Sequence, residues 1–268
     1  MKYAQTLLSQ LRVMFAFLWR DSYVESRMAK DLIINYGLLW PIPYAVALGY
    51  IQVGANFGGD PTLRAVMFAG NILLLNVVVN HLQTIPLLFD LEGDRYVDFQ
   101  RIVLDPRLVI LQRIIFSALF GFLAMAPFFP MSKLLLQSAL ETSHTNWPAL
   151  FLVLLCGSFC SAAYNMVVIL FIPSSRELWS FWNRVQNVLV SLGGFWIPWY
   201  ITNQFSGLLA KAVLLTPFVY FSEGLRQAII GGEKFLPLSI CLGGMLAFTA
   251  LFTLVSFVLF KRKVDYVA

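Results

Sequence analysis

Six long apolar runs limit what this chain can fold into more than any other feature. They cover residues 32–53, 65–89, 108–129, 148–172, 185–201 and 235–260. Each run is near or above the roughly 17 to 25 residues that an α-helix needs to cross the hydrocarbon core of a bilayer. Backbone polar groups at that depth are satisfied only inside helices or closed barrels. The sequence therefore predicts an all-α membrane protein with six transmembrane helices.

The composition agrees with this prediction and favours a single domain. Of the 268 residues, 59% are hydrophobic and only 12% are charged, which is far from the balance of a soluble domain. No long polar block separates the apolar runs, so residues 1–268 are predicted to form one transmembrane domain. Residues 1–30 are predicted to form an interfacial helix and residues 31–204 to contain spans one to five. Residues 205–234 are predicted to form an outer re-entrant hairpin, and residues 235–268 span six with a cytoplasmic tail.

The first residues have the pattern of an amphipathic helix. Apolar side chains recur at spacings of three and four, at Leu7, Leu11, Met14, Phe15 and Leu18. This pattern predicts a helix that lies in the membrane interface. A secretory signal peptide is the alternative, but Gln10 and Arg12 interrupt the apolar stretch and no small-residue cleavage site follows. We expect the segment to remain in the mature protein.

Basic residues give the orientation. With a cytoplasmic N-terminus, most lysines and arginines fall on the inner side, including those of the final Lys261–Arg262–Lys263 run. The positive-inside rule then predicts that both termini are cytoplasmic, as an even number of spans requires. This orientation accounts for the net charge of +5, so a nucleic-acid partner is not expected.

The loop after the second span combines acids, arginines and aromatics in FDLEGDRYVDFQRIVLDPR. Gly93 and Pro106 bracket a segment in which Tyr96 and Phe99 fall on one helical face. This pattern predicts a short helix parallel to the membrane that could dock on a soluble partner. A solvated loop whose charges only keep it out of the bilayer is the alternative.

Amide side chains form a stripe in the second span. Asn76, Asn80 and Gln83 lie four and three residues apart, which places them on one helix face. Amides facing lipid are unfavourable, so this face is predicted to meet the bundle interior, a subunit interface or a wet cavity. Interhelical hydrogen bonding is the simpler interpretation, and lining a transport path is the alternative. His81 has no second ligand at suitable spacing, so no metal site is predicted.

Aromatic residues gather where the fifth predicted span reaches the outer surface, with Trp196, Trp199 and Tyr200 as its main members. An ordinary interfacial belt is the simpler interpretation. A surface on which sugars or lipids stack at an exit is the alternative.

The stretch LTPFVYFSEGLRQAIIGGE, residues 215–233, places charges between two apolar segments. The apolar piece before it carries Lys211 and Pro217, which favours a re-entrant hairpin over a further span. Glu223 and Arg226 lie three residues apart and are expected to satisfy each other or nearby backbone groups, because an unpaired buried charge is costly. Whether the pair is structural or acts directly in substrate exit stays open.

Several catalytic patterns are absent from the sequence. It contains no GxxxxGK[ST], GxSxG, HExxH or CxxC motif, and Cys156, Cys160 and Cys241 all lie in apolar runs. We therefore expect no enzyme activity, no bound cofactor and no ATP site in this chain. A membrane-embedded lipid or sugar transferase would need clustered acids or histidines, and the candidates are scattered over three outer loops, at Asp60, Glu141, His144 and Glu233.

The order of these features resembles the permease subunit of ABC-2-type transporters. The stretch TPFVYFSEGLRQAIIGG before the last span carries the resemblance most clearly. Its matching residues are Pro217, Glu223, Leu225, Arg226 and Gly231, while Thr216 stands where the family commonly has Asn.

The resemblance implies a homodimer of this chain bound to two copies of a cytoplasmic ABC ATPase, which would bind ATP and Mg, in the bacterial inner membrane. The helix of the charged loop would be the coupling helix, with Asp94, Arg95, Tyr96, Asp98, Phe99 and Arg101 as the candidate ATPase contacts. The candidate path-lining residues are Asn76, Asn80, Gln83, Trp196, Trp199 and Tyr200.

The resemblance leaves several cargoes open. Members of the family export lipid-linked polysaccharides, teichoic acid precursors, drugs and lipids, and the aromatic outer end favours a glycan or glycolipid. The first span reads LIINYGLLWPIP, in which only Tyr36, Gly37 and Trp40 loosely match the pattern of polysaccharide permeases. Efflux of a drug or another small molecule is therefore the alternative. A transferase or an assembly factor is less favoured.

Overall fold

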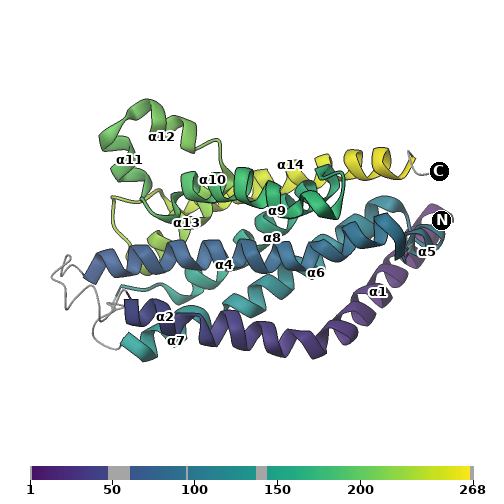
Figure 1. The fold of residues 1–268 in the computed structure, drawn as a ribbon, viewed down its shortest axis with the longest axis horizontal. Helices are drawn as coiled ribbons and strands as arrows, with labels where there is room; N and C mark the ends of the chain where they lie inside the picture. Colours follow the sequence, from purple (N-terminus) through teal and green to yellow (C-terminus); the bar gives the residue numbers. More distant parts are fainter. Residues whose placement is uncertain (1, 48–60, 95, 137–143, 266–268) are drawn as a thin grey trace.

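The computed structural model describes residues 2–47, 61–94, 96–136 and 144–265. Within these ranges all regular structure is helical and there is no strand. The long helices run roughly along the long axis of the molecule (Figure 1).

Four helical stretches are long and apolar enough to cross a membrane. They are α4, Pro61–Phe89; α6 together with α7, Pro106–Met125 and Phe128–Leu136; α8, Trp147–Phe171; and α14, Leu238–Asp265. The apolar runs of the sequence predict spans over the same four stretches. These stretches agree with a helical membrane protein.

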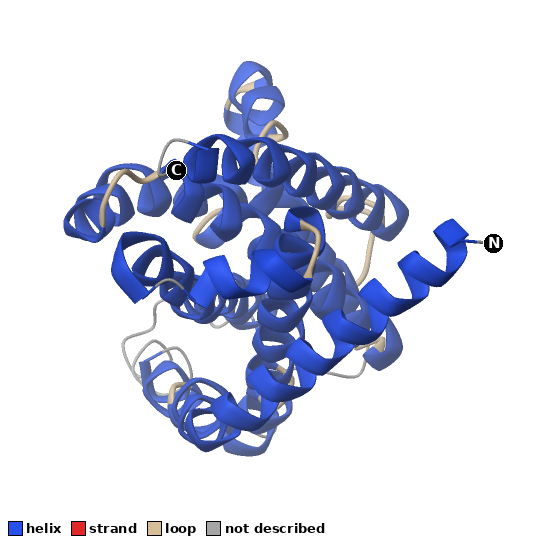
Figure 2. Cartoon of the chain, turned by 90° about the vertical axis from the view of Figure 1, so that its right-hand side faces the viewer, coloured by secondary structure: helices blue, strands red, loops and turns tan. Residues whose placement is uncertain are grey.

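Helix α8 forms the centre of the bundle. It packs against α4, α6, α14 and α13, the last being Pro217–Ile229. Small residues permit this: a Cβ added to Gly157 would overlap the ring of Phe221 in α13. In contrast, α14 is largely exposed and lies on the outside of the bundle in the end-on view (Figure 2). Its exposed apolar side chains, such as Leu246 and Leu254, fit a helix surrounded by lipid.

The first predicted span is continuous with the N-terminal helix. Helix α1, Lys2–Leu32, leads directly into a wide π-helical segment, η1, Ile33–Leu39, and then into α2, Pro41–Ala45. The N-terminal part of α1 is oblique to the long helices and reaches sideways out of the bundle (Figures 1 and 2). Residues 48–53 of the predicted span lie outside the described residues.

The fifth predicted span differs from the expectation of one long helix over residues 185–201. From residue 178 the chain is helical, but short α-helical and π-helical pieces alternate along it. These pieces, after a short turn at η5 (Ser175–Glu177), are α9 (Leu178–Phe181), η6 (Trp182–Gln186), α10 (Asn187–Val190) and η7 (Ser191–Phe195). The helical run is broken at Gly194, whose φ of 87° lies in the left-handed region. Pro198 then precedes the next helix. The prediction of helix through residue 201 was wrong because this break interrupts it.

A bent helical pair follows, as the hairpin prediction requires. Helix α11, Trp199–Phe205, leads into α12, Gly207–Val213, and α12 meets α13 at an angle of 99°. Pro217 is at the first position of α13, where its missing N–H costs nothing, and Thr216 precedes it. The bend fits a re-entrant hairpin or a broken span, which would be a fifth crossing.

The two ends of the bundle differ. The beginning of α1, the short helix α5 (Tyr96–Val103) and the end of α14 lie at one end, which we call the α5 end (Figure 1). Helices α2, α7, α11 and α12 lie toward the other end, which we call the hairpin end (Figure 1).

Candidate functional site

Helix α5 has one face buried and one face exposed. Val97 and Gln100 are buried against the bundle, whereas Phe99 is 55% exposed and Ile102 is 84% exposed. A π turn, η3 (Asp90–Asp94), joins α4 to this helix. Large apolar side chains exposed at the end of the bundle offer a surface to a partner. Arg95 lies outside the described residues, as does the Asp94 carboxylate.

Charged residues border the exposed face of α5. Asp98 and Arg101 form an ion pair with 3.4 Å between Oδ1 and Nη1, and both belong to the predicted coupling set. The pair is at the surface, where such contacts contribute little to stability. Its charges therefore remain accessible to another protein.

Aromatic contacts hold α5 against α1. The Phe17 ring meets Tyr96 and Phe99 edge-on, with ring centroids 6.4 and 6.3 Å apart. The guanidinium of Arg20 lies 4.3 Å from the centre of the Tyr96 ring. Gln10 of α1 also accepts a hydrogen bond from the backbone N–H of Asp105 at 3.0 Å. The predicted coupling helix is thus attached to the N-terminal helix by side chains.

A half-buried polar network fixes the base of α5. Nη2 of Arg113 donates to Oδ2 of Asp90 at 2.6 Å and to Oε1 of Gln100 at 3.0 Å. Nearby, Gln112 donates to Asp21 at 2.7 Å. Burial raises the pKa of the Asp21 carboxyl above its ordinary value, although the hydrogen bond from Gln112 and the charge of Arg113 oppose this shift. These contacts connect α5, α6, η3 and α1 in one unit.

Gln83 lines a cavity of about 170 Å³ beside this network, together with Arg20 and Asp90. Asn76 and Asn80 have a different environment, since both are fully buried inside the bundle. The structure therefore places the three predicted path-lining amides of α4 in two different surroundings.

Asn76 and Asn80 join α4 to α6 and α8. Asn76 donates to Oγ of Ser158 at 2.7 Å, and Asn80 donates to the Asn76 side chain at 3.1 Å. Oγ of Ser117 donates to Oδ1 of Asn80 at 3.0 Å. These bonds favour the interhelical interpretation of the stripe, whereas path lining stays a prediction.

Asn165 of α8 continues the polar contacts toward η6. Its Nδ2 donates to the Val77 carbonyl at 3.2 Å, and its Oδ1 accepts from Gln186 at 3.2 Å. The same oxygen lies 3.1 Å from Nδ1 of His81, whose ring is 4.9 Å from that of Trp182. One amide therefore connects three helical segments. The sequence singles out His81 but not these partners, because the partners belong to apolar segments far apart in the sequence.

Glu223 and Arg226 form a fully buried ion pair, which we call the hairpin pair. Nη1 of Arg226 donates to Oε1 of Glu223 at 2.9 Å, and both side chains are 0% exposed. The same carboxylate oxygen accepts the backbone N–H of Trp199 at 3.0 Å. Arg226 also donates through Nη2 to the Gly194 carbonyl. The predicted pairing is present and backbone groups add to it, whereas Oε2 of Glu223 and Nε of Arg226 are buried without a hydrogen-bond partner among the described residues.

The hairpin pair sits at two helix ends whose polarity it matches. Gly194 ends the helical run before the break, where backbone carbonyls lack partners, and Trp199 begins α11, where N–H groups lack partners. A cation at a helix C-terminus and an anion at an N-terminus are both stabilising. Ser222 adds a hydrogen bond to the Gly193 carbonyl at 2.8 Å. The pair therefore stabilises the break of the fifth predicted span.

The predicted outer aromatics differ in exposure and in their contacts. Trp196 is 56% exposed, whereas Nε1 of Trp199 donates to the Ala210 carbonyl of α12 at 3.3 Å. Tyr200 meets Phe235 edge-on, with centroids 5.7 Å apart. Pro217 starts α13, and Gly231, with a φ of 73°, follows its end.

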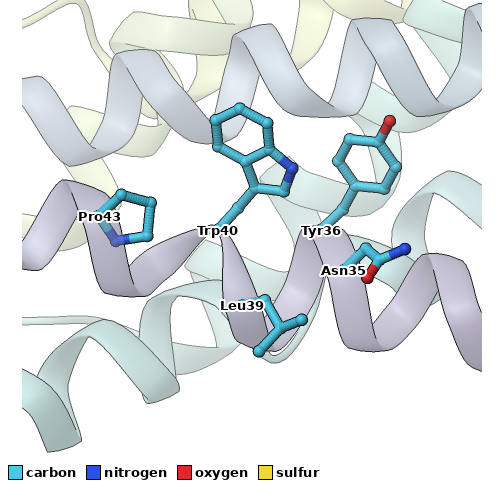
Figure 3. A pocket seen from close by; sticks show the side chains of 5 residues that line it. All are labelled: Asn35, Tyr36, Leu39, Trp40 and Pro43. Atoms are coloured by element: carbon cyan, nitrogen blue, oxygen red, sulfur yellow. The ribbon is translucent and has the colours of Figure 1, made fainter.

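A second aromatic group lies on η1 and α2. Tyr36 and Trp40 are nearly parallel, with ring centroids 6.4 Å apart and 7° between their planes, and Tyr44 follows 5.9 Å from Trp40. Tyr36 and Trp40 project to the same side (Figure 3). They border a cavity of about 380 Å³ together with Asn35 and Pro43. The four-residue spacing could have predicted this aromatic ladder.

Among the described residues, no three His, Cys, Asp or Glu side chains are close enough to hold a metal ion. Comparison with known protein families, curated proteins and solved structures finds no significant match to this chain.

Proposed function

We propose that this chain is the permease subunit of an ABC-2-type transporter of the bacterial inner membrane, exporting a glycan, glycolipid or lipid. Two copies would form the translocation path between them and bind two copies of a separate ATPase, which supplies the ATP and Mg site. The observation that carries the proposal is α5, an amphipathic helix whose apolar face is exposed at the end that also holds the end of α14.

The contacts of α5 support a coupling role. An external force on its exposed face reaches α1 through Phe17 and α6 through Gln100 and Arg113. A partner that moved α5 would therefore move the helices that carry it. Such a rigid connection is what conversion of ATP binding into a change of permease conformation requires.

The proposed topology has six spans and an interfacial helix. The first span would begin with η1 and α2, and the fifth would be the broken run over residues 178–195. An oblique α1 supports the interfacial assignment, because it exposes Phe15 and Trp19 at 63% and 76%. Both termini would then be cytoplasmic, with the hairpin pair near the outer leaflet.

The aromatic ladder of Tyr36, Trp40 and Tyr44 favours a glycan or glycolipid cargo. Aromatic faces carry negative potential and pack well against the C–H faces of sugar rings. Asn35 adds an amide for hydroxyl groups at the same cavity. Efflux of a drug or another small molecule by the same architecture is the second candidate.

The test is capture of the tagged chain from its native host in mild detergent. We expect an ATP-hydrolysing subunit in equal amount, and we expect Phe99→Ser combined with Ile102→Ser to release it. Leu134→Ser is the matched control, because Leu134 is 71% exposed but belongs to α7. Isolation of the wild-type chain with no ATPase would reject the proposal and favour a transferase or an assembly factor.

A further inference from the structure

A cavity of about 720 Å³ lies between the start of α6 and the last turns of α14. Arg107 belongs to one wall, and Lys261 and Arg262 belong to the other. All three cations are exposed. Two elements far apart in the sequence thus bring three positive charges to one concave surface.

The helices that form this cavity indicate where it lies relative to the membrane. The apolar stretches Pro106–Leu136 and Leu238–Lys263, each long enough to cross a membrane, both end here. Phe257 and Val258 line the cavity one turn inside the cations, and Val258 is 53% exposed. The site therefore has a cationic rim above an apolar wall, as at the depth where lipid headgroups meet acyl chains.

The neighbouring charged groups have other roles. Nζ of Lys263 donates to the Ile172 carbonyl at 2.6 Å, where it stabilises the end of α8. The Asp105 carboxylate lines the cavity but accepts the backbone N–H of Arg107 at 2.8 Å, as the cap of α6. No carboxylate in the described part of the chain forms an ion pair with the three rim cations.

We propose that this cavity binds the phosphate headgroup of an anionic phospholipid, with an acyl chain against Phe257 and Val258. Orientation by the positive-inside rule requires basic residues near the ends of spans, but it does not require them to converge on a cavity from two helices. Basic pockets between membrane helices on the cytoplasmic side have the chemistry that anionic headgroups need. None of the residues that line the cavity belongs to α5 or to the hairpin pair.

The experiment is native mass spectrometry of the full chain in mild detergent containing equal amounts of phosphatidylglycerol and phosphatidylcholine. We expect the wild type to retain phosphatidylglycerol selectively. Each rim cation contributes about 1 kcal/mol to such binding, so Arg107→Gln should lower retention about 5-fold and Lys261→Gln with Arg262→Gln about 30-fold. Arg176→Gln with Arg184→Gln removes the same charge from exposed sites elsewhere and should retain the lipid.

Three results would overturn the proposal. Equal loss in the control pair would show that binding reflects only overall charge. Equal retention of both lipids would show that the headgroup is not recognised. Displacement of phosphatidylglycerol by millimolar inorganic phosphate would show a site for a soluble anion, in which the apolar wall has no part.

Discussion

At the residue scale, the buried hairpin pair is stable only together with its backbone partners. Removing one member of a buried ion pair commonly costs about 3–5 kcal/mol, because the other charge remains without compensation. Here the loss of Arg226 would also leave the Gly194 carbonyl without its donor. Glu223 would keep only the N–H of Trp199 among these contacts.

We therefore expect Arg226→Met to lower the Tm in detergent by about 10 °C. Glu223→Gln combined with Arg226→Met should be more stable than Arg226→Met alone, because no charge then remains buried. Arg176→Met, at an exposed position, is the control and should change the Tm little. A double variant no more stable than the single one would contradict this account of the pair.

A second prediction at this scale concerns Asn165. Asn165→Leu removes the partner of the Val77 carbonyl, His81 and Gln186, and we expect a loss of about 1–2 kcal/mol. Asn187→Leu changes an exposed amide and should be nearly neutral. Thermal unfolding of both variants in the same detergent tests the difference, and equal Tm values would show that the interhelical bonds contribute little.

At the element scale, the break before α11 depends on close contact with α4. A Cβ added to Gly70 would overlap the carbonyl oxygen of Phe195, which is backbone and cannot rotate away as a side chain could. We expect Gly70→Ala to destabilise the chain by about 1–3 kcal/mol. Gly207→Ala, in α12, meets open space and should be neutral or stabilising. A Gly70→Ala variant with the Tm of the wild type would mean that η7 is not held against α4.

The helices differ in how well the sequence predicts them. Long apolar runs such as α8 were recognised because length and hydropathy alone require a helix in lipid. The bend at Pro217 was also visible, since proline removes a backbone donor. The break near Gly194 was missed, because its broken backbone bonds are replaced by Glu223 and Arg226 from a separate segment. The sequence predicted that these two residues satisfy each other or nearby backbone groups, but not that the backbone groups are those of Trp199 and Gly194.

At the scale of the whole molecule, the helices place α5 and the hairpin at opposite ends (Figure 1). In a variant whose three cysteines are replaced by alanine, Asp98→Cys should react with an impermeant maleimide only from the cytoplasmic side. His144→Cys, at an exposed position three residues before α8, should react only from the outside. Labelling of both positions from one side would contradict the predicted topology.

The subunit composition of the purified complex tests the proposed transport function most directly. We would determine by native mass spectrometry the subunit composition of the complex purified from the native host, and measure ATP hydrolysis by the same sample. We expect two copies of this chain, two copies of an ATPase, and hydrolysis that is lost when Phe99→Ser and Ile102→Ser release the ATPase. A chain that is isolated without an ATPase, from cells in which it is functional, would contradict the assignment as a transport subunit.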